Sequence, residues 1–181
     1  MTEDVACPIL SRPLKVDEIR DGVSGEIAAT SAELEAVAKM LDLVALDRLT
    51  FTYRLSRGAG GRLSLTGTLR ADATQTCVVS LEPVAARLEV PVEMEFWPAE
   101  LLPRGEPNPD DHASARVLDW PEAIREGKID LGPVVYETLA TALDPYPRHP
   151  EARFDWPQTP AAEGEGAGSG PFASLAALKR R

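Results

Sequence analysis

The feature that most constrains the fold is a change of hydrophobic period between residues 46 and 49. Before it, apolar residues recur at intervals of three and four, the spacing of one buried helical stripe: Leu34, Val37, Ala38, Leu41, Val44 and Ala45. After it, residues 49–55 alternate between apolar and polar side chains, as in a strand with one face in water. The change predicts a helix over 31–46 followed closely by a strand.

Two further stretches, 62–71 and 88–96, show the same alternation. The run Gly58-Ala59-Gly60-Gly61 separates the first two alternating stretches and tolerates the positive φ angles of a hairpin loop. Three strands with short connections predict an antiparallel sheet whose apolar face is covered by helix. The expected fold class is therefore α+β, with an antiparallel sheet packed by two main helices.

Both helices carry start signals. Thr30 and Glu33 have the spacing of a capping box, in which each side chain satisfies a backbone N–H of the other residue. Asp130 is an N-cap candidate for a second helix, with Pro133 in its first turn. The run Pro145-Tyr146-Pro147 is expected to stop that helix.

Composition divides the rest of the chain. Apolar residues around Pro8 and Pro13 suggest an extended strand near the start, and 97–120 is expected to be a long acidic surface loop. We expect a single domain over 1–156. It is followed by a flexible Gly-rich linker over 157–170 and a short amphipathic docking segment over 171–181.

Charge and length exclude several classes of protein. The net charge of the 181 residues is −10, the sign opposite to that of most small nucleic-acid-binding modules. No apolar run approaches the roughly 18 residues of a membrane span, and the acidic start lacks a secretory signal. Two cysteines make no disulfide framework. We expect a cytoplasmic protein without membrane partners.

Reactive groups are sparse. The two histidines, His112 and His149, lie in expected loops, and the sequence contains no Cys-x-x-Cys or His-x-x-x-His pair for zinc. The run Gly58–Gly61 lacks the lysine and hydroxyl of a phosphate-binding loop. The sequence therefore predicts a protein that is not an enzyme and has no catalytic residue, metal or cofactor.

Three separated segments, 67–84, 129–147 and 171–179, together resemble the YceD family. The resemblance covers about residues 60–179 and implies a role in accumulation of large-subunit (23S) ribosomal RNA. The residues that carry its first two motifs are Gly67, Cys77, Leu81, Asp130, Leu131, Glu137, Pro145 and Pro147. Many family members have a Cys-x-x-Cys-Leu pattern, whereas Ser80 stands here in place of the second cysteine. A metal role inferred from those relatives fails for this chain, and Cys77 is expected to be a semi-buried thiol at a strand end.

The third segment offers a candidate partner-binding element. A helix this short is marginal in water, so the segment must dock on its own domain or on another molecule, and both remain open. The residues expected to make the contact are Pro171, Phe172, Leu175, Leu178 and Lys179. The family motif usually begins Asn-Pro-Phe, whereas this chain has Gly170 in the first position.

Two binding mechanisms fit the resemblance. One is direct contact with ribosomal RNA through 179–181 and through arginines near the first hairpin: Arg54, Arg57, Arg62 and Arg70. The other is binding of a basic ribosomal or assembly protein by the acidic region 93–130, which the net charge favours. An alternative from another class is a small-molecule or acyl-group binding domain linked to lipid metabolism. Its distinguishing feature would be an empty apolar cavity between sheet and helix.

Overall fold

A computed structural model describes residues 9–19, 22–102 and 121–153. Within these residues five strands form one sheet in the order β2-β3-β4-β5-β6, and two more strands, β1 and β7, form a small ribbon. The three expected strands are β3 (Ala45–Arg57), β4 (Leu63–Thr76) and β5 (Pro83–Pro98), each antiparallel to its neighbour along the chain. The α+β class is confirmed, with β6 (Glu122–Ile124) added parallel to β5.

The chain also forms short strands that the sequence pattern did not reveal. At the other edge of the sheet, β2 (Val23–Ala28) pairs with β3. The ribbon consists of β1 (Pro13–Lys15) and β7 (Lys128–Asp130), so the expected extended strand near the start is only three residues long. Single turns of 3-10 helix occur at Val16–Glu18, Ala59–Gly61 and Ala99–Leu101.

Helix α1 (Ser31–Met40) begins at the expected capping box, with Glu33 N donating to Thr30 Oγ1 and Thr30 N to Glu33 Oε2. The helix is shorter than predicted. Asp42 has a φ of 53° and reverses the chain, after which Val44 N donates to Thr74 O near the end of β4. The predicted helix over 31–46 is therefore wrong beyond Met40, because Ala45, the last apolar residue of the stripe, begins β3 instead.

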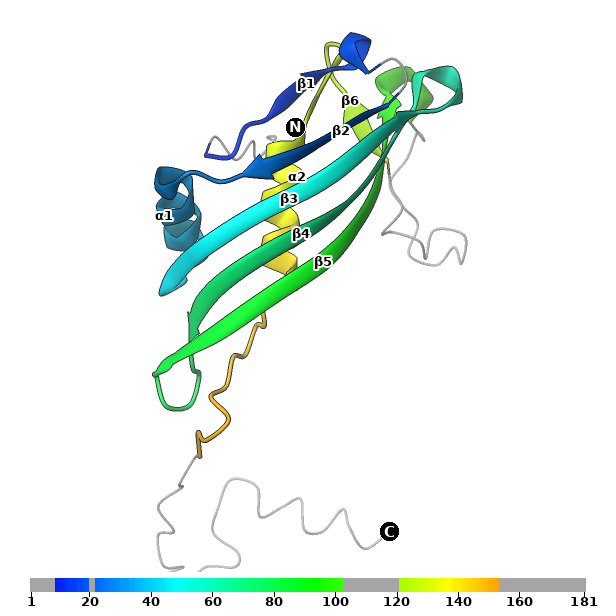
Figure 1. Ribbon diagram of the computed structural model, residues 1–181. Helices are drawn as coiled ribbons and strands as arrows, with labels where there is room; N and C mark the ends of the chain where they lie inside the picture. Colours follow the sequence, from blue (N-terminus) through cyan, green and yellow to red (C-terminus); the bar gives the residue numbers. More distant parts are fainter. Residues whose placement is uncertain (1–8, 20–21, 103–120, 154–181) are drawn as a thin grey trace, which may run out of the picture.

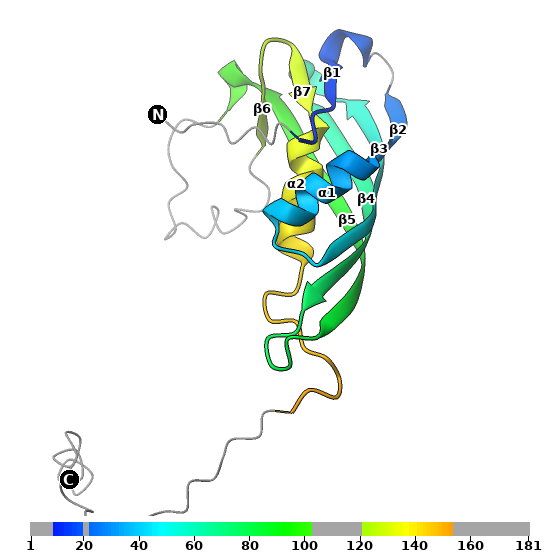
Figure 2. The same cartoon turned by 90° about the vertical axis from the view of Figure 1, so that its left-hand side faces the viewer.

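Helix α2 (Leu131–Ala142) begins at Asp130, as expected, and ends before Pro145. Figure 1 shows α2 behind the sheet, and Figure 2 shows both helices on the same side of it. Leu139 and Val135 of α2 and Val37 of α1 join the buried inward side chains of the central strands in one core. The opposite face of the sheet, turned toward the viewer in Figure 1, is covered by no described element.

Gly67 permits close packing at the centre of this core. A Cβ on Gly67 would lie 2.6 Å from the carbonyl oxygen of Thr52 and 2.7 Å from the Phe51 ring. The ring of Phe51 also stacks on Tyr53, with centroids 6.0 Å apart. The absence of a side chain at residue 67 thus makes room for an aromatic ring over the strand.

The expected division of the chain after residue 153 stays a prediction, because those residues lie outside the described ones. This concerns the domain boundary at residue 156, the linker 157–170 and the segment 171–181. The same holds for most of the expected loop 97–120. Its first residues differ from expectation, since Trp97 and Pro98 belong to β5 and Ala99–Leu101 form a helical turn.

Candidate interaction surface

The turn between β4 and β5 is closed by two backbone hydrogen bonds in which Cys77, its first residue, donates one and accepts the other. Cys77 N donates to Glu82 O at 2.8 Å, and Leu81 N donates to Cys77 O at 3.0 Å. Cys77 was expected to be semi-buried, but its side chain is fully enclosed. The burial arises because a second segment of the chain covers the turn.

That second segment follows α2 and lies beside the turn in both views (Figures 1 and 2). Val78 N donates to Pro147 O at 2.9 Å, and the Gln75 side chain donates to Asp144 O at 2.9 Å. His149 N donates to Cys77 Sγ at 3.3 Å. The turn and the segment after α2 are therefore bound together although about 70 residues separate them.

The sulfur of Cys77 accepts backbone N–H groups from three residues: Val79 at 3.4 Å, Ser80 at 3.3 Å and His149 at 3.3 Å. These donors, led by His149 and joined by the Ser80 hydroxyl, lower the pKa of Cys77 to about 6. The sulfur therefore serves as an internal acceptor for N–H groups from both segments. Ser80, in place of the second family cysteine, contributes two of the donors.

Three large apolar side chains on these joined segments face solvent. Val78 is 46% exposed, Tyr146 71% and Leu81 76%, and we call these three residues the turn patch. Exposed charged residues lie within two positions of it in sequence at Glu82, Asp144 and Arg148. An apolar centre beside charged residues is typical of a protein-binding surface.

The structure brings together four of the eight residues that carry the family resemblance, namely Cys77, Leu81, Pro145 and Pro147. The sequence did not single out Val78, because exposure of an apolar residue depends on what packs against it. Tyr146 lies between two prolines, and this position is the one local signal that could have marked it as surface-exposed.

Asp130 and Leu131, two more of the eight residues, lie away from the turn patch and stabilise the fold. Asp130 Oδ1 accepts from Gly132 N at 2.9 Å and Arg12 N at 2.6 Å, while Oδ2 accepts from Ser11 Oγ at 2.8 Å. Leu131 is fully buried. Asp130 therefore caps α2 and ties it to the segment before β1.

Two of the eight residues that carry the family resemblance remain. Gly67 lies at the centre of β4, as described above. Glu137 is exposed on α2, and its backbone carbonyl accepts from Thr141 Oγ1 at 2.8 Å. The expected contact residues of the terminal segment lie outside the described residues.

Comparison with known protein families finds a match that covers all of these positions. The profile described as "Large ribosomal RNA subunit accumulation protein YceD" matches residues 65–179. The chain belongs to the YceD family. The match includes the turn patch, α2 and the terminal segment, in agreement with the resemblance noted from the sequence. Searches of curated proteins and of solved structures found no significant match.

The arginines proposed for RNA contact have different surroundings in this YceD-family chain. Arg70 pairs with Glu89 at 2.8 Å and holds the pKa of that carboxyl below its usual value. The Arg62 guanidinium lies 3.8 Å from the centroid of the Trp97 ring. Arg54 and Arg57 are exposed on β3. Two of these four arginines, Arg62 and Arg70, therefore already interact with side chains of the same chain.

The acidic region 93–130 is also divided by the fold. In its described part, Glu93 and Glu95 lie on the open face of β5, whereas Glu122 and Glu126 lie around β6 and the turn that follows it. Asp130 caps α2. The described acids thus occupy several places and form no single surface.

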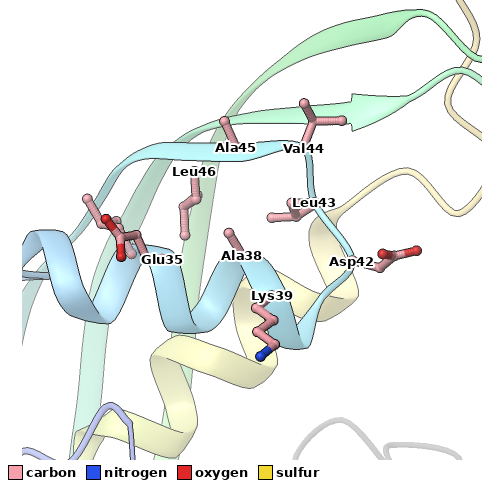
Figure 3. A pocket seen from close by; sticks show the side chains of 9 residues that line it. Glu35, Ala38, Lys39, Asp42, Leu43, Val44, Ala45 and Leu46 are labelled. Carbon is pink, nitrogen blue, oxygen red and sulfur yellow. The ribbon is translucent and has the colours of Figure 1, made fainter.

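Buried side chains such as Val37, Leu69 and Leu139 form the core between the sheet and the helices. Hollows occur at the edges instead. One, of about 520 Å³, lies between α1 and the start of β3 and opens to solvent (Figure 3). Ala38, Leu43 and Leu46 point toward it, while Asp42 points away. The acyl-group alternative stays a prediction, because the packing of the core does not test it.

Among residues 9–19, 22–102 and 121–153, no three His, Cys, Asp or Glu side chains gather closely enough to hold a metal ion. In the same ranges, no helix has the length and apolar character needed to cross a membrane. The expectations that the protein lacks a cofactor and a catalytic residue stay predictions.

Proposed function

We propose that this protein supports accumulation of large-subunit (23S) ribosomal RNA by binding a basic ribosomal or assembly protein, without catalysing a reaction. The family description supports the first part of this proposal. The structure supports the binding part through the turn patch, and above all through Leu81.

Leu81 is unfavourable for the isolated fold in two ways. Its side chain is 76% exposed, and its φ of 63° places a branched residue in the left-handed region. That conformation costs about 1–2 kcal/mol for an L-residue other than glycine, asparagine or aspartate. Strain of this kind, at a hydrogen-bonded turn with exposed apolar neighbours, is typical of binding surfaces.

A protein partner fits the surface better than RNA does. Apolar side chains such as Leu81 and Tyr146 are exposed, and the whole chain carries a charge of −10. This charge repels phosphate and attracts a basic protein through its long-range field. The proposal includes action in the cytoplasm, where ribosomal subunits assemble.

The terminal segment is proposed to add a second contact with the same partner, through Phe172, Leu175 and Leu178. Deletion of 170–181 tests this assignment against docking on the protein's own domain. Weaker capture of the partner at unchanged thermal stability would support the proposed contact. Unchanged capture with lowered stability would support docking within the chain.

The function is tested by titrating the full chain with purified basic large-subunit ribosomal proteins and, separately, with 23S ribosomal RNA fragments at physiological salt. We expect binding of at least one of the proteins and weaker binding when Leu81 is replaced by asparagine. Cells that lack the protein should accumulate less mature large-subunit RNA, and the wild-type chain should restore it better than the Leu81→Asn variant. Tight binding to RNA alone, or substrate turnover by the pure chain, would contradict the proposal.

A further inference from the structure

The outer edge of β2 exposes a regular set of backbone hydrogen-bonding groups. Ala29 N donates to Leu49 O, and the register pairs Ile27 with Phe51 and Gly25 with Tyr53. In an antiparallel pair, residues that exchange both bonds alternate with residues whose backbone groups point the other way. The N–H and C=O groups of Ser24, Glu26 and Ala28 therefore point away from β3.

No partner for these six groups lies among the residues that the structure describes, since β2 ends the strand order and pairs with β3 alone. Figure 1 shows β2 at one margin of the sheet. The strand has six residues, which makes an edge of about 20 Å at roughly 3.3 Å per residue. Such an edge is a template for one more strand.

A groove accompanies this edge. It has a volume of about 380 Å³ and lies between β2 and residues 11–14. Leu14, Ile27, Tyr53 and Leu131 supply its apolar lining. The guanidinium of Arg12, which also lines the groove, is paired with Glu33 at 2.7 Å. An added strand could therefore place alternate apolar side chains against the groove while its backbone pairs with β2.

One exposed acid of the edge, Glu26, whose charge also acts on Arg70 of β4, distinguishes between two kinds of occupant. Glu26 is the middle one of the three outward-pairing residues and is exposed on the open face of the sheet. A second copy that used all three residues in a two-fold antiparallel pair would set Glu26 against Glu26, and like charges directly opposite are destabilising. A lysine or arginine in that place would instead be attracted.

We propose that the edge of β2 binds an extended segment of a basic partner protein by strand addition, with a cationic residue opposite Glu26 and its two neighbours against the groove. This inference rests on the proposed function and names a surface for the same partner. Backbone pairing provides affinity, and the side chains at alternate positions provide selectivity.

The test uses the ¹⁵N-labelled full chain and a synthetic peptide with the pattern Gly-Ser-Thr-Val-Lys-Val-Thr-Ser-Gly. A matched peptide carries Glu in place of Lys. Addition of the lysine peptide should slow amide hydrogen exchange at Ser24, Glu26 and Ala28 and leave Gly25 and Ile27 as protected as before. Rapid exchange at all three residues with peptide bound would overturn the proposal, as would failure of the peptide to bind.

Charge exchange supplies the second measurement. Glu26→Lys should weaken binding of the lysine peptide roughly fivefold and strengthen binding of the glutamate peptide by a similar factor. Glu35→Lys makes the same charge change on the exposed side of α1 and should leave both affinities within about twofold. Equal effects of the two variants would overturn the proposal.

Other occupants give distinct results. Protection of Ser24, Glu26 and Ala28 in the free monomer would mean that a segment of the same chain already covers the edge. Concentration-dependent dimerisation that Glu26→Lys alters would assign the edge to a second copy. Either result overturns the proposal.

If the basic ribosomal protein binds the chain but Glu26→Lys leaves that binding unchanged, the edge is not its site and the proposed function stands. If only the peptide binds, the proposed function fails and the edge assignment stands.

Discussion

The backbone N–H of His149 donates to the sulfur of Cys77 at 3.3 Å, across 72 positions of sequence. This bond is the leading cause of the lowered pKa of Cys77 and joins the segment after α2 to the turn between β4 and β5. The two segments that carry Leu81 and Tyr146 are thereby held in one arrangement. The exposed apolar side chains thus lie on two segments that are joined at the buried Cys77.

The stability of the protein should rise between about pH 6 and pH 9. The folded pKa of Cys77 is about 6 and the ordinary value is 9.0, so within this window the unfolded state binds more protons than the folded state. The contribution of the thiolate is complete above the ordinary value and is lost as pH falls through about 6. Urea midpoints measured across this range should therefore increase with pH, and Cys77→Ser should flatten the increase. Cys7→Ser is the control and should retain it; equal slopes for Cys77→Ser and the wild type would contradict the assignment.

Replacement of Leu81 should separate stability from binding. Leu81→Asn relieves the left-handed strain and should raise the free energy of unfolding by about 1 kcal/mol while it weakens capture of the partner. Leu81→Ala is the matched variant, because it removes the exposed side chain but keeps the strain. It should weaken capture without a gain in stability. Unchanged capture by both variants would remove Leu81 from the proposed surface.

Gly67→Ala should destabilise the sheet. The added methyl group would lie 2.6 Å from Thr52 O and 2.7 Å from the Phe51 ring, so the strand or the ring must move. Overpacking of this kind costs about 1–3 kcal/mol, measurable by urea denaturation. Gly58→Ala is the control, since its nearest neighbour would be 3.7 Å away, and should change stability by less than about 0.5 kcal/mol. A similar loss for the two variants would argue against crowding as the cause.

Asp130→Ala should lower the free energy of unfolding by about 2–3 kcal/mol, because it removes an N-cap and two further charge-assisted hydrogen bonds. Asp130→Asn should cost less, since its amide oxygen can still accept from Gly132. Thermal or urea unfolding of the two variants provides the comparison. Losses of the same size would indicate that the carboxylate charge, and not the cap geometry, is what α2 requires.

Local chemistry in the sequence determined several elements of this protein. The capping box at Thr30 and Glu33, the N-cap at Asp130 and the alternation in β3, β4 and β5 depend on side chains within a few residues of one another. These signals predicted the α+β class and the start of each helix. Three separated motifs also indicated the family, which the profile match confirmed.

Tertiary structure decided the features that depend on distant neighbours. The end of α1 at Met40 follows from pairing with Thr74 near the end of β4, and β2 is a strand because β3 lies beside it. The burial of Cys77, and with it the turn patch, arises only when the segment after α2 folds back onto the turn. Burial and strand pairing are properties of two segments at once, so the pattern within either segment could not specify them.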